Sequence, residues 1–301
     1  MNGLQIRLFG APSITLADGS EIELSSEKAR ALLAYLAVEA DQAHRREKLV
    51  GLLWPNFTEG SARANLRRAL ADLRLAIGDQ QAMPPFLHIT WETIQFNLAS
   101  AAWVDANAFK TLLESKLHTR SLQPAEIASL AEAATLYRRP FLDGFSVPDS
   151  AAFEEWELIT REKFHRQALQ CLHRLSEAYQ ENGEYEGALE YAYRQVEMEP
   201  WQESGHRQIM QLLALTGQRA AALAQYQTCR GLLEKELSTC PSEETQTLYD
   251  QLRQGQWPLA GKDLSGRATR LVGDCPYRGL SAFREQDTPF SSDAKDMPLA
   301  C

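Results

Sequence analysis

The chain has 301 residues, of which 44% are hydrophobic and 24% are charged, and this composition is typical of a globular protein of about two domains. Its formal net charge of −9 excludes a protein that is basic throughout. The charge is uneven, because residues 44–78 contain seven Lys or Arg and three Asp or Glu, a net charge of +4 that leaves −13 on the remainder. A basic segment joined to an acidic body suits a protein that binds nucleic acid through one part and protein through another.

No apolar run approaches the roughly 18 residues of a membrane-spanning helix, and the N-terminus lacks a signal-peptide pattern. The five cysteines are scattered and never spaced as CxxC, so reduced thiols in a cytoplasm are the simplest interpretation. We therefore expect a cytoplasmic protein without a membrane partner.

The chain opens with patterns of short strands. Residues 4–9 alternate apolar and polar side chains until Gly10 interrupts them. Residues 14–16 and 21–24 indicate two further short strands, joined by a turn at residues 17–20.

Two helical patterns follow the strands. Ser26 can cap the first helix, whose buried face is formed by Ala29, Leu32, Leu33, Leu36 and Ala37. The second runs over residues 46–54 and stops at Pro55, and its inward side chains are Leu49, Leu52 and Leu53. Its start is basic, with Arg45, Arg46 and Lys48.

A third helix is predicted over residues 60–78, with the sequence GSARANLRRALADLRLAIG. Ser61 can cap its start, and Gly78 suits the left-handed turn that ends a helix. A buried stripe is predicted by the apolar side chains at helical spacing, which are Ala62, Leu66, Ala69, Leu70, Leu73 and Ile77. Outside the stripe lie the polar side chains Arg63, Asn65, Arg67, Arg68 and Arg74. Guanidinium groups bind phosphate and guanine edges and asparagine binds adenine, although a solvated arginine face on an ordinary helix has the same pattern.

Residues 87–91 and 94–98 flank Glu92 and Thr93 as a β-hairpin. Strands, three helices and a closing hairpin make a winged helix-turn-helix, whose third helix would enter the major groove of DNA. His88 is the one basic side chain of the wing, so we expect weak contacts between wing and phosphate. The predicted DNA-binding residues are Arg45, Arg46, Lys48, Arg63, Asn65, Arg67, Arg68, Arg74 and His88.

A second domain, residues 103–255, is helical almost throughout and follows a winged-helix domain of residues 1–100. Residues 122–137 and 151–182 are predicted helices, and the second is long enough to contain a break. An offset of 34 residues relates Leu175 to Ile209, Gly183 to Gly217, Ala188 to Ala222 and Leu189 to Leu223. Pro200 lies where a tetratricopeptide unit has its closing proline. We therefore expect a mainly α protein with a winged helix followed by tetratricopeptide-like repeats.

Three stretches of the first domain resemble the DNA-binding domain of the antibiotic-regulatory-protein type of bacterial transcriptional activator: LFGAPSITLADG, SEKARALLAYLAVEADQAHRREKLVGLLWP and SARANLRRALADLRLAIGD. The matching positions are Trp54-Pro55, Ser61-Ala62-Arg63, Leu66, Leu73-Arg74 and Gly78. The middle of the third helix departs from the pattern, since Arg67-Arg68-Ala69 stands where many members carry polar or aromatic residues. The resemblance implies an OmpR-type winged helix and does not indicate which base sequence it reads.

Stretches of the second domain resemble the bacterial transcriptional activator domain that follows this winged helix in the family: SLAEAATLYRRPFLDG, FEEWELITREKFHRQALQCLHRLSEAYQENGEY and GQRAAALAQYQTCRGLLEKELSTCPSEETQTLYDQL. The resemblance covers residues 4–254. It implies an activator that binds tandem repeats in double-stranded DNA, contacts RNA polymerase and associates with itself on those repeats. A nucleoid-associated location in the cytoplasm follows from the same reasoning.

Residues 256–301 are predicted to be an irregular tail, in which CPYRGLSAFREQDTPF resembles the lead-in to the NTPase module of longer relatives. A phosphate loop at Gly255 to Lys262 is excluded, because five residues separate the glycines and Asp263 replaces the Ser or Thr that binds magnesium. No HExxH, GxSxG or GxGxxG motif is present, so we expect no enzyme activity, no cofactor and no metal. His165, Cys171 and His173 are attributed to packing, and the six tryptophans to the core.

Two classes of function fit these features. The first is a sequence-specific transcription factor, which the concentration of arginines on one helix favours. The second is a tetratricopeptide adaptor that binds a protein or peptide, with a winged helix that does not bind DNA.

Overall fold

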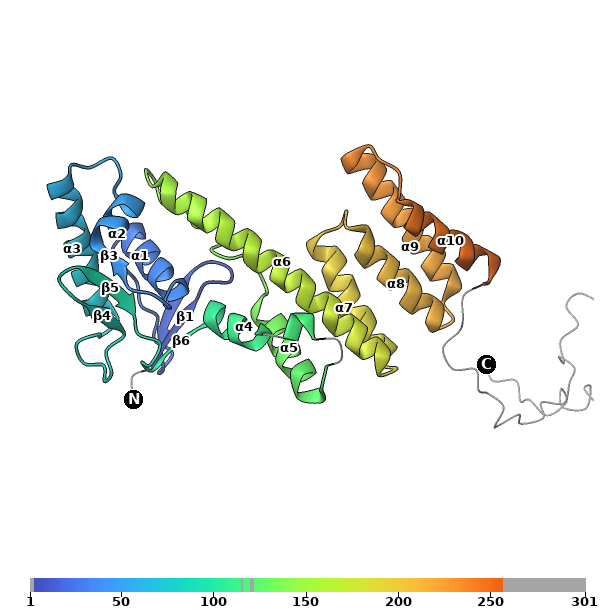
Figure 1. Ribbon diagram of the computed structural model, residues 1–301, viewed down its shortest axis with the longest axis horizontal. Coiled ribbons are helices and arrows are strands. Elements are labelled where there is room, and N and C mark those ends of the chain that lie inside the picture. The colour runs from blue at the N-terminus through green and yellow to red at the C-terminus, as the bar shows by residue number, and fades with distance from the viewer. Residues whose placement is uncertain (1–2, 115, 120–121, 257–301) are drawn as a thin grey trace, which may run out of the picture. The chain divides into compact units, whose positions relative to one another are not determined.

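The computed structural model describes residues 3–114, 116–119 and 122–256, so all but Gln256 of the predicted tail lies outside the described part of the chain (Figure 1). Strands occur only in the first 104 residues of this part, and helices make up nearly all of the rest. The predicted fold class, a winged helix followed by a helical repeat domain, is confirmed.

Two small sheets form the β-structure of the N-terminal region. The first has the order β2-β1-β6, in which β1 (Leu4–Arg7) pairs antiparallel with β2 (Ser13–Leu16) and parallel with β6 (Ala102–Val104). The second has the order β3-β5-β4, in which β5 (Thr93–Phe96) pairs antiparallel with both β3 (His44–Arg45) and β4 (Leu87–Ile89). The predicted hairpin around Glu92 is thus the wing.

The strand predicted at residues 21–24 is wrong, because Glu21 makes only an isolated bridge to Thr15. The tight turn at residues 17–20 is closed by the bond from Ser20 N to Asp18 Oδ1 (2.9 Å), and beyond it Ile22 N donates to Ile14 O at 2.8 Å without continuing as a ladder. The strand β6 lies where the sequence predicts the start of the helical domain, so this strand is not predicted by the sequence.

Three helices lie between these strands: α1 (Glu27–Val38), α2 (Arg46–Leu53) and α3 (Glu59–Ala76). Ser26 caps α1 as expected, since its side chain accepts a hydrogen bond from Ala29 N at 3.1 Å. The predicted cap of α3 is wrong, because the helix begins at Glu59 after Thr58, and Ser61 lies within its first turn. Thr58 is also a good N-cap residue type, and a glutamate in the first turn is favourable for the helix dipole. Gly78 ends the helix region with φ +66°, as predicted.

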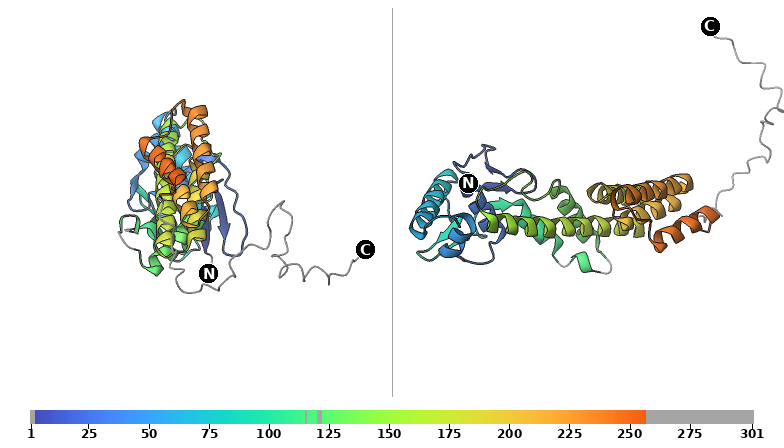
Figure 2. Two further views of the ribbon diagram at one scale, coloured as in Figure 1. Left: turned by 90° about the vertical axis from the view of Figure 1, so that its right-hand side faces the viewer. Right: turned by 90° about the horizontal axis from the view of Figure 1, so that it is seen from above.

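The helical domain contains α4 (Asp105–Leu113), a short 3₁₀ helix η1 (Lys116–His118) and α5 (Pro124–Leu136). Then follow α6 (Ala151–Glu181), α7 (Tyr185–Met198), α8 (Glu203–Leu215), α9 (Arg219–Leu232), a π-helical turn η2 (Leu233–Leu237) and α10 (Glu243–Gln254). Helix α6 is one continuous helix, without the break that its length allowed. In Figures 1 and 2, α7, α8 and α9 lie side by side in sequence order.

The 34-residue repeat corresponds to two helical hairpins, α6–α7 and α8–α9. Gly183 and Gly217 occupy equivalent turns with φ +78° and +80°, a backbone conformation that favours glycine. Ala188 and Ala222 are fully buried, so their small side chains allow the paired helices to approach closely. The predicted tetratricopeptide-like arrangement is therefore present.

The winged helix and the first helices of the second domain share one hydrophobic core. A single buried cluster extends from Leu4 to Leu175, through β1, α1, α3, α4 and α6. Backbone bonds cross the junction, from Leu142 N to Leu8 O (2.8 Å) and from Gly10 N to Pro140 O (2.9 Å). The Asp105 carboxylate accepts from Leu8 N at 2.8 Å and from Phe9 N at 3.0 Å. These contacts tie the segment after β1 to the start of α4 and to the loop after α5.

The described tryptophans do not all belong to the core. Trp54 is buried and Trp156 half-buried, but Trp91, Trp103 and Trp201 are 85%, 38% and 51% exposed. Trp257 lies outside the described residues. Among residues 3–256, as far as the structure describes them, no helix combines the length and the hydropathy that crossing a membrane requires.

Candidate nucleic-acid interface

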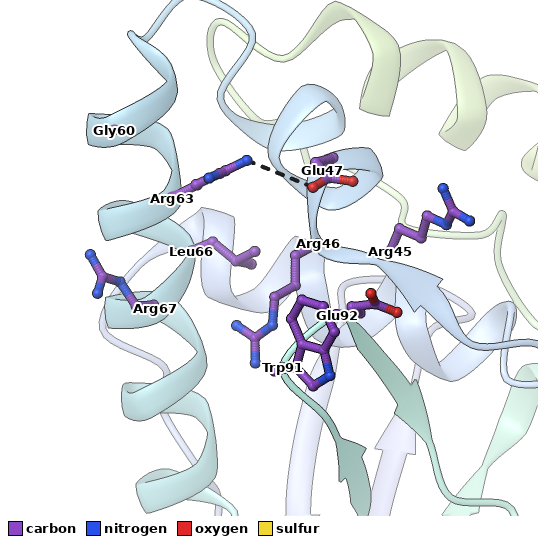
Figure 3. A pocket seen from close by; sticks show the side chains of 9 residues that line it. All are labelled: Arg45, Arg46, Glu47, Gly60, Arg63, Leu66, Arg67, Trp91 and Glu92. Atoms are coloured by element: carbon purple, nitrogen blue, oxygen red, sulfur yellow. Dashed lines mark ion pairs between the residues drawn. The ribbon is translucent and has the colours of Figure 1, made fainter.

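A cleft of about 710 Å³ lies between α3, the start of α2 and the turn of the wing (Figure 3). It is lined by arginines from three elements, by an exposed tryptophan and by two carboxylates: Arg45, Arg46, Glu47, Gly60, Arg63, Leu66, Arg67, Trp91 and Glu92. The cleft therefore gathers four of the nine predicted DNA-binding residues at one place.

Helix α3 supplies one wall of this cleft because it is amphipathic. Ala62, Leu66 and Leu73 are almost completely buried, and Leu66 alone of them also reaches the cleft wall. Arg67 and Arg68 are exposed on the outward surface, and Figure 3 shows Arg67 directed away from the helix axis toward open solvent. The buried stripe thus determines which arginines are free to meet a ligand.

Arg63 has carboxylate neighbours within the protein. Its Nη2 lies 2.6 Å from Glu59 Oε1, one turn earlier on α3, and 3.7 Å from Glu47 Oε1 on α2. All three side chains are more than half exposed, and ion pairs of this kind contribute about 1 kcal/mol or less. A phosphate group can therefore compete with these carboxylates for Arg63.

Arg46 connects the wing to α2. Its backbone N–H donates to Glu92 O at 2.9 Å, and its guanidinium Nη2 donates to Thr90 O at 2.9 Å. Partial burial, with a smaller contribution from the neighbouring charge of Arg67, lowers the pKa of Arg46 from its ordinary value. Arg46 remains a cation at the floor of the cleft, but part of its hydrogen-bonding capacity serves the wing.

The turn of the wing presents Trp91. Thr90 Oγ1 accepts hydrogen bonds from Thr93 N at 2.8 Å and from Glu92 N at 3.2 Å, and Thr90 N donates to Thr93 O at 2.9 Å. These bonds define the turn, while the indole itself is 85% exposed and reaches the cleft beside Arg46 (Figure 3). Sequence reasoning placed this residue in the core; its position in a four-residue turn next to two polar residues was the signal that it projects outward.

The other predicted residues lie away from the cleft. Arg74 donates from Nε to Asp79 Oδ2 at 2.9 Å, and the buried Asp79 also accepts from Leu87 N at 3.0 Å. Arg74 thus fastens the end of α3 to the first strand of the wing. Lys48 Nζ lies 5.7 Å from the centre of the Tyr35 ring. Arg68 of α3 and His88 of β4 are exposed. Asn65 is half-buried on α3.

The histidines and the cysteine noted on α6 take part in contacts between helices. His165 Nε2 lies 3.1 Å from Glu199 Oε1, and His173 Nδ1 lies 3.1 Å from Gln208 Oε1. Cys171 Sγ donates to Leu130 O, and burial raises the pKa of its thiol to about 12. In the part of the chain that the structure describes, no group of three or more His, Cys, Asp or Glu side chains is arranged to hold a metal ion.

Taken together, the architecture defines a winged-helix protein with a tetratricopeptide-like helical domain and an arginine-lined cleft beside the third helix. The model of the bacterial transcriptional activator domain matches residues 104–253. The chain thus carries a bacterial transcriptional activator domain after a winged helix, which is the organisation of bacterial transcriptional activators of the antibiotic-regulatory-protein type.

Known proteins share this organisation. The transcriptional regulatory protein MoaR1 of Mycobacterium tuberculosis is 24% identical over 304 aligned positions, which cover 98% of this chain and 92% of MoaR1. The protein of the same name from Mycobacterium bovis has the same identity and coverage. A solved structure of Mycobacterium tuberculosis EmbR in complex with a low-affinity phosphopeptide has a TM-score of 0.66 and 20% identity, and the match covers 86% of this chain and 67% of EmbR. The EmbR match establishes the fold, and the two MoaR1 proteins are named as transcriptional regulatory proteins.

Proposed function

We propose that this transcriptional regulator binds double-stranded DNA in a sequence-specific manner, with α3 in the major groove and the wing on the adjacent backbone. The observation that carries the proposal is the cleft beside α3, where Arg45, Arg46, Arg63 and Arg67 surround open space on one face. Guanidinium groups bind phosphate and guanine edges, and a helix followed by a wing has the dimensions to reach both.

We assign different DNA contacts to the different arginines of this region. Arg67 and the neighbouring Arg68 project from the middle of α3, so we assign base contacts to them. Arg63 and Arg45 also line the cleft, and we assign them to phosphate. Arg74 is held by the buried Asp79, so its main role is to position the end of α3, with at most a minor phosphate contact. Lys48, Asn65 and His88 lie outside the cleft lining and remain secondary candidates.

Trp91 is added to the proposed interface. The apolar side chain of Trp91 is 85% exposed on an ordered turn, and DNA-binding proteins use exposed apolar side chains as wedges between base steps. Because the wing carries no Lys or Arg, we assign its contribution to this indole rather than to cations.

The helical domain is proposed to provide protein contacts, with RNA polymerase and a second copy bound to a tandem site as partners. This assignment is supported by the acidic balance of the chain outside residues 44–78, which disfavours contact with a duplex. Tandem sites place two copies in the same direction, and such a pair needs no twofold axis. A cytoplasmic, nucleoid-associated location belongs to the same proposal.

Fluorescence anisotropy with labelled DNA from upstream of the protein's own gene tests this function. Wild-type protein should bind a restricted segment and raise its anisotropy, and excess unrelated DNA should not abolish this rise. The variant Arg67→Ala should weaken binding, whereas Arg230→Gln, which removes an exposed arginine from α9, should not. Equal binding by all three proteins, or none by the wild type to any genomic segment, would instead favour the adaptor alternative.

A further inference from the structure

A groove runs across the helical domain at a distance in sequence from the arginine cleft. Two adjoining pockets of about 410 and 470 Å³ share Arg207 and Gln211 of α8. The first pocket is completed by the last turns of α6, and the second by α10. The groove is therefore lined by the first helices of successive hairpins and by the final helix, which is the side on which helical repeats present extended surfaces.

The groove is acidic at both ends. Glu177 and Glu181 lie on the α6 side, and Glu243 and Glu244 lie on the α10 side. Arg207, the arginine between them, is already engaged, because its Nη2 lies 3.0 Å from Glu244 Oε2 and its Nη1 donates to Thr245 Oγ1 at 3.1 Å. A ligand that enters the groove meets an excess of negative charge.

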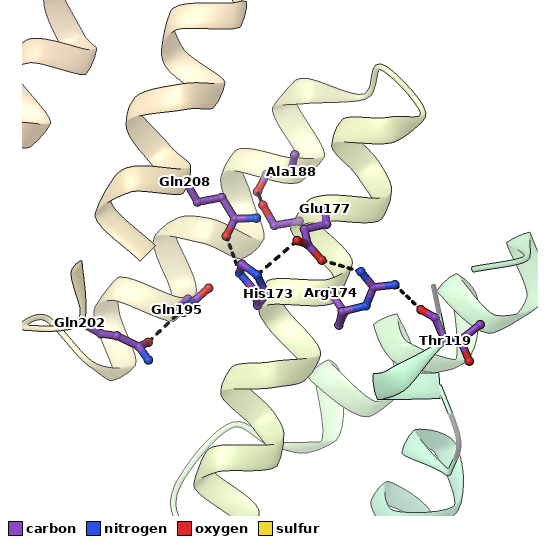
Figure 4. Close-up of polar contacts among 9 residues, drawn as sticks. Thr119, His173, Arg174, Glu177, Ala188, Gln195, Gln202 and Gln208 are labelled. Carbon is purple, nitrogen blue, oxygen red and sulfur yellow. Dashed lines mark hydrogen bonds and ion pairs between the residues drawn. The ribbon is translucent and has the colours of Figure 1, made fainter. Parts of the chain in front are cut away.

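Side-chain amides lie between these carboxylates. Gln208 is only 5% exposed and lines the first pocket, and its Oε1 lies 3.1 Å from His173 Nδ1 (Figure 4). Its amide nitrogen makes no hydrogen bond to any residue that the structure describes. Turning the amide over exchanges the two atoms and still leaves one of them unpaired. Because Gln208 lines the pocket, this amide nitrogen can donate a hydrogen bond to a ligand that brings an acceptor.

Further amides continue the pattern along the groove. Gln180 of α6, Gln211 of α8 and Gln251 of α10 line the two pockets, and none of their side chains has a hydrogen bond to another described residue. An extended polypeptide offers an N–H and a C=O at every residue, and an amide side chain can pair with either. Amides along the groove with carboxylates at its ends therefore fit a peptide main chain with cationic side chains.

We propose that this groove binds an extended segment of a partner protein that is rich in lysine or arginine. The inference deepens the proposed role of the helical domain in protein contacts and does not depend on DNA binding by α3. The sign of the charge excludes a nucleic acid strand as the occupant. Since Glu177 is held by Arg174 at 2.5 Å and by His173 at 3.3 Å (Figure 4), the carboxylates most available to the ligand are Glu181 and Glu243.

The test uses the full chain and three fluorescein-labelled peptides of ten residues, which alternate alanine with lysine, glutamate or glutamine. Anisotropy at low salt should show binding of the lysine peptide alone. Removing two charges with Glu181→Gln and Glu243→Gln together should weaken that binding about fivefold or more. Gln211→Ala, which changes no charge, should also weaken it. The matched control Glu190→Gln with Glu197→Gln, on exposed positions of α7 outside the groove, should bind within about twofold of the wild type.

Three results would overturn the proposal: no binding of the lysine peptide by the wild type, an equal loss in the α7 control, or an unchanged affinity in both groove variants. Circular dichroism of each variant verifies that it is folded, and DNA anisotropy is measured in parallel. Peptide binding without DNA binding would refute only the proposed function of α3, and DNA binding without peptide binding would refute only the groove.

Discussion

The junction between the winged helix and the helical domain depends on Asp105, and its replacement provides a stringent test of the fold. The side chain is 4% exposed and accepts hydrogen bonds from three backbone N–H groups, those of Leu8, Phe9 and Ala106, at 2.8, 3.0 and 2.7 Å. Asp105→Ala leaves Leu8 N and Phe9 N without acceptors at the end of β1. An unsatisfied buried polar group costs about 1–3 kcal/mol, so two should lower the free energy of unfolding by about 2–6 kcal/mol.

Urea unfolding followed by circular dichroism measures this change. Asp105→Asn should lose less than Asp105→Ala, because one oxygen can still accept from Leu8 N and Ala106 N while the amide opposes Phe9 N–H. Asp41→Ala, at an exposed position after α1, is the matched control and should change stability by no more than about 0.5 kcal/mol. If Asp105→Ala were as stable as this control, the junction would not be held by the carboxylate.

The same residue has a predictable pH dependence. Burial, which outweighs the three backbone hydrogen bonds, raises the pKa of Asp105 above its ordinary value in the folded protein. A group with a raised folded pKa binds its proton more tightly when folded, so its contribution to stability is present at low pH and is lost as pH rises through the folded pKa. The stability difference between wild type and Asp105→Asn should therefore grow as the pH is lowered from 7 toward 4. A difference that shrinks on acidification would show that the hydrogen bonds, and not burial, dominate.

Three further predictions concern other parts of the molecule. DNA affinity should fall steeply from low to physiological salt, because several arginines would release counterions from phosphates, and a flat titration would contradict the proposed interface. Arg67→Ala or Arg68→Ala should reduce the DNA-binding free energy by about 1–3 kcal/mol and relax the preference at one base pair in a binding-site selection. Trp91→Ala should weaken binding to all DNA sequences alike, whereas Trp91→Phe should retain most of the affinity. Burial lowers the pKa of His206, whose ring nitrogen Nε2 lies 2.8 Å from Pro200 O. The stability of the protein should therefore fall as the pH drops through about 6.5. Urea midpoints at pH 7.5 and 5.5 measure this loss, which should be smaller in His206→Gln.

Features that depend on local periodicity were predictable from the sequence. The buried stripe of α3 was predicted residue by residue, since helical geometry alone places Leu66 and Leu73 on one face. The cap at Ser26 and the turns at Gly183 and Gly217 were predictable for the same reason, because a cap or a left-handed turn depends on residue types within a few positions.

Features that depend on distant residues were not predictable. The strand β6 is only three residues long, and it is a strand because it pairs with β1, almost a hundred residues earlier in the chain. Arg74 has the same helical periodicity as Arg63 and Arg67. The loop after α3, however, places the Asp79 carboxylate 2.9 Å from the Arg74 guanidinium. A helical projection shows which side chains lie outside the core. It does not show which of them already form a hydrogen bond or an ion pair within the protein.

The shared core changes what the two modules can do separately. Residues 1–100 lack β6, Asp105 and the hydrophobic side chains of α4 and α6 that complete the cluster around β1 and α1. A fragment that ends at Ser100 would expose this surface to water, and a small domain has little stability to lose. We therefore expect that fragment to be unfolded, whereas a fragment that ends at Glu181, after α6, retains the junction and folds cooperatively. Cooperative urea unfolding of the shorter fragment at wild-type stability would refute the argument, because it would show that the winged helix does not need the helices with which it shares its core.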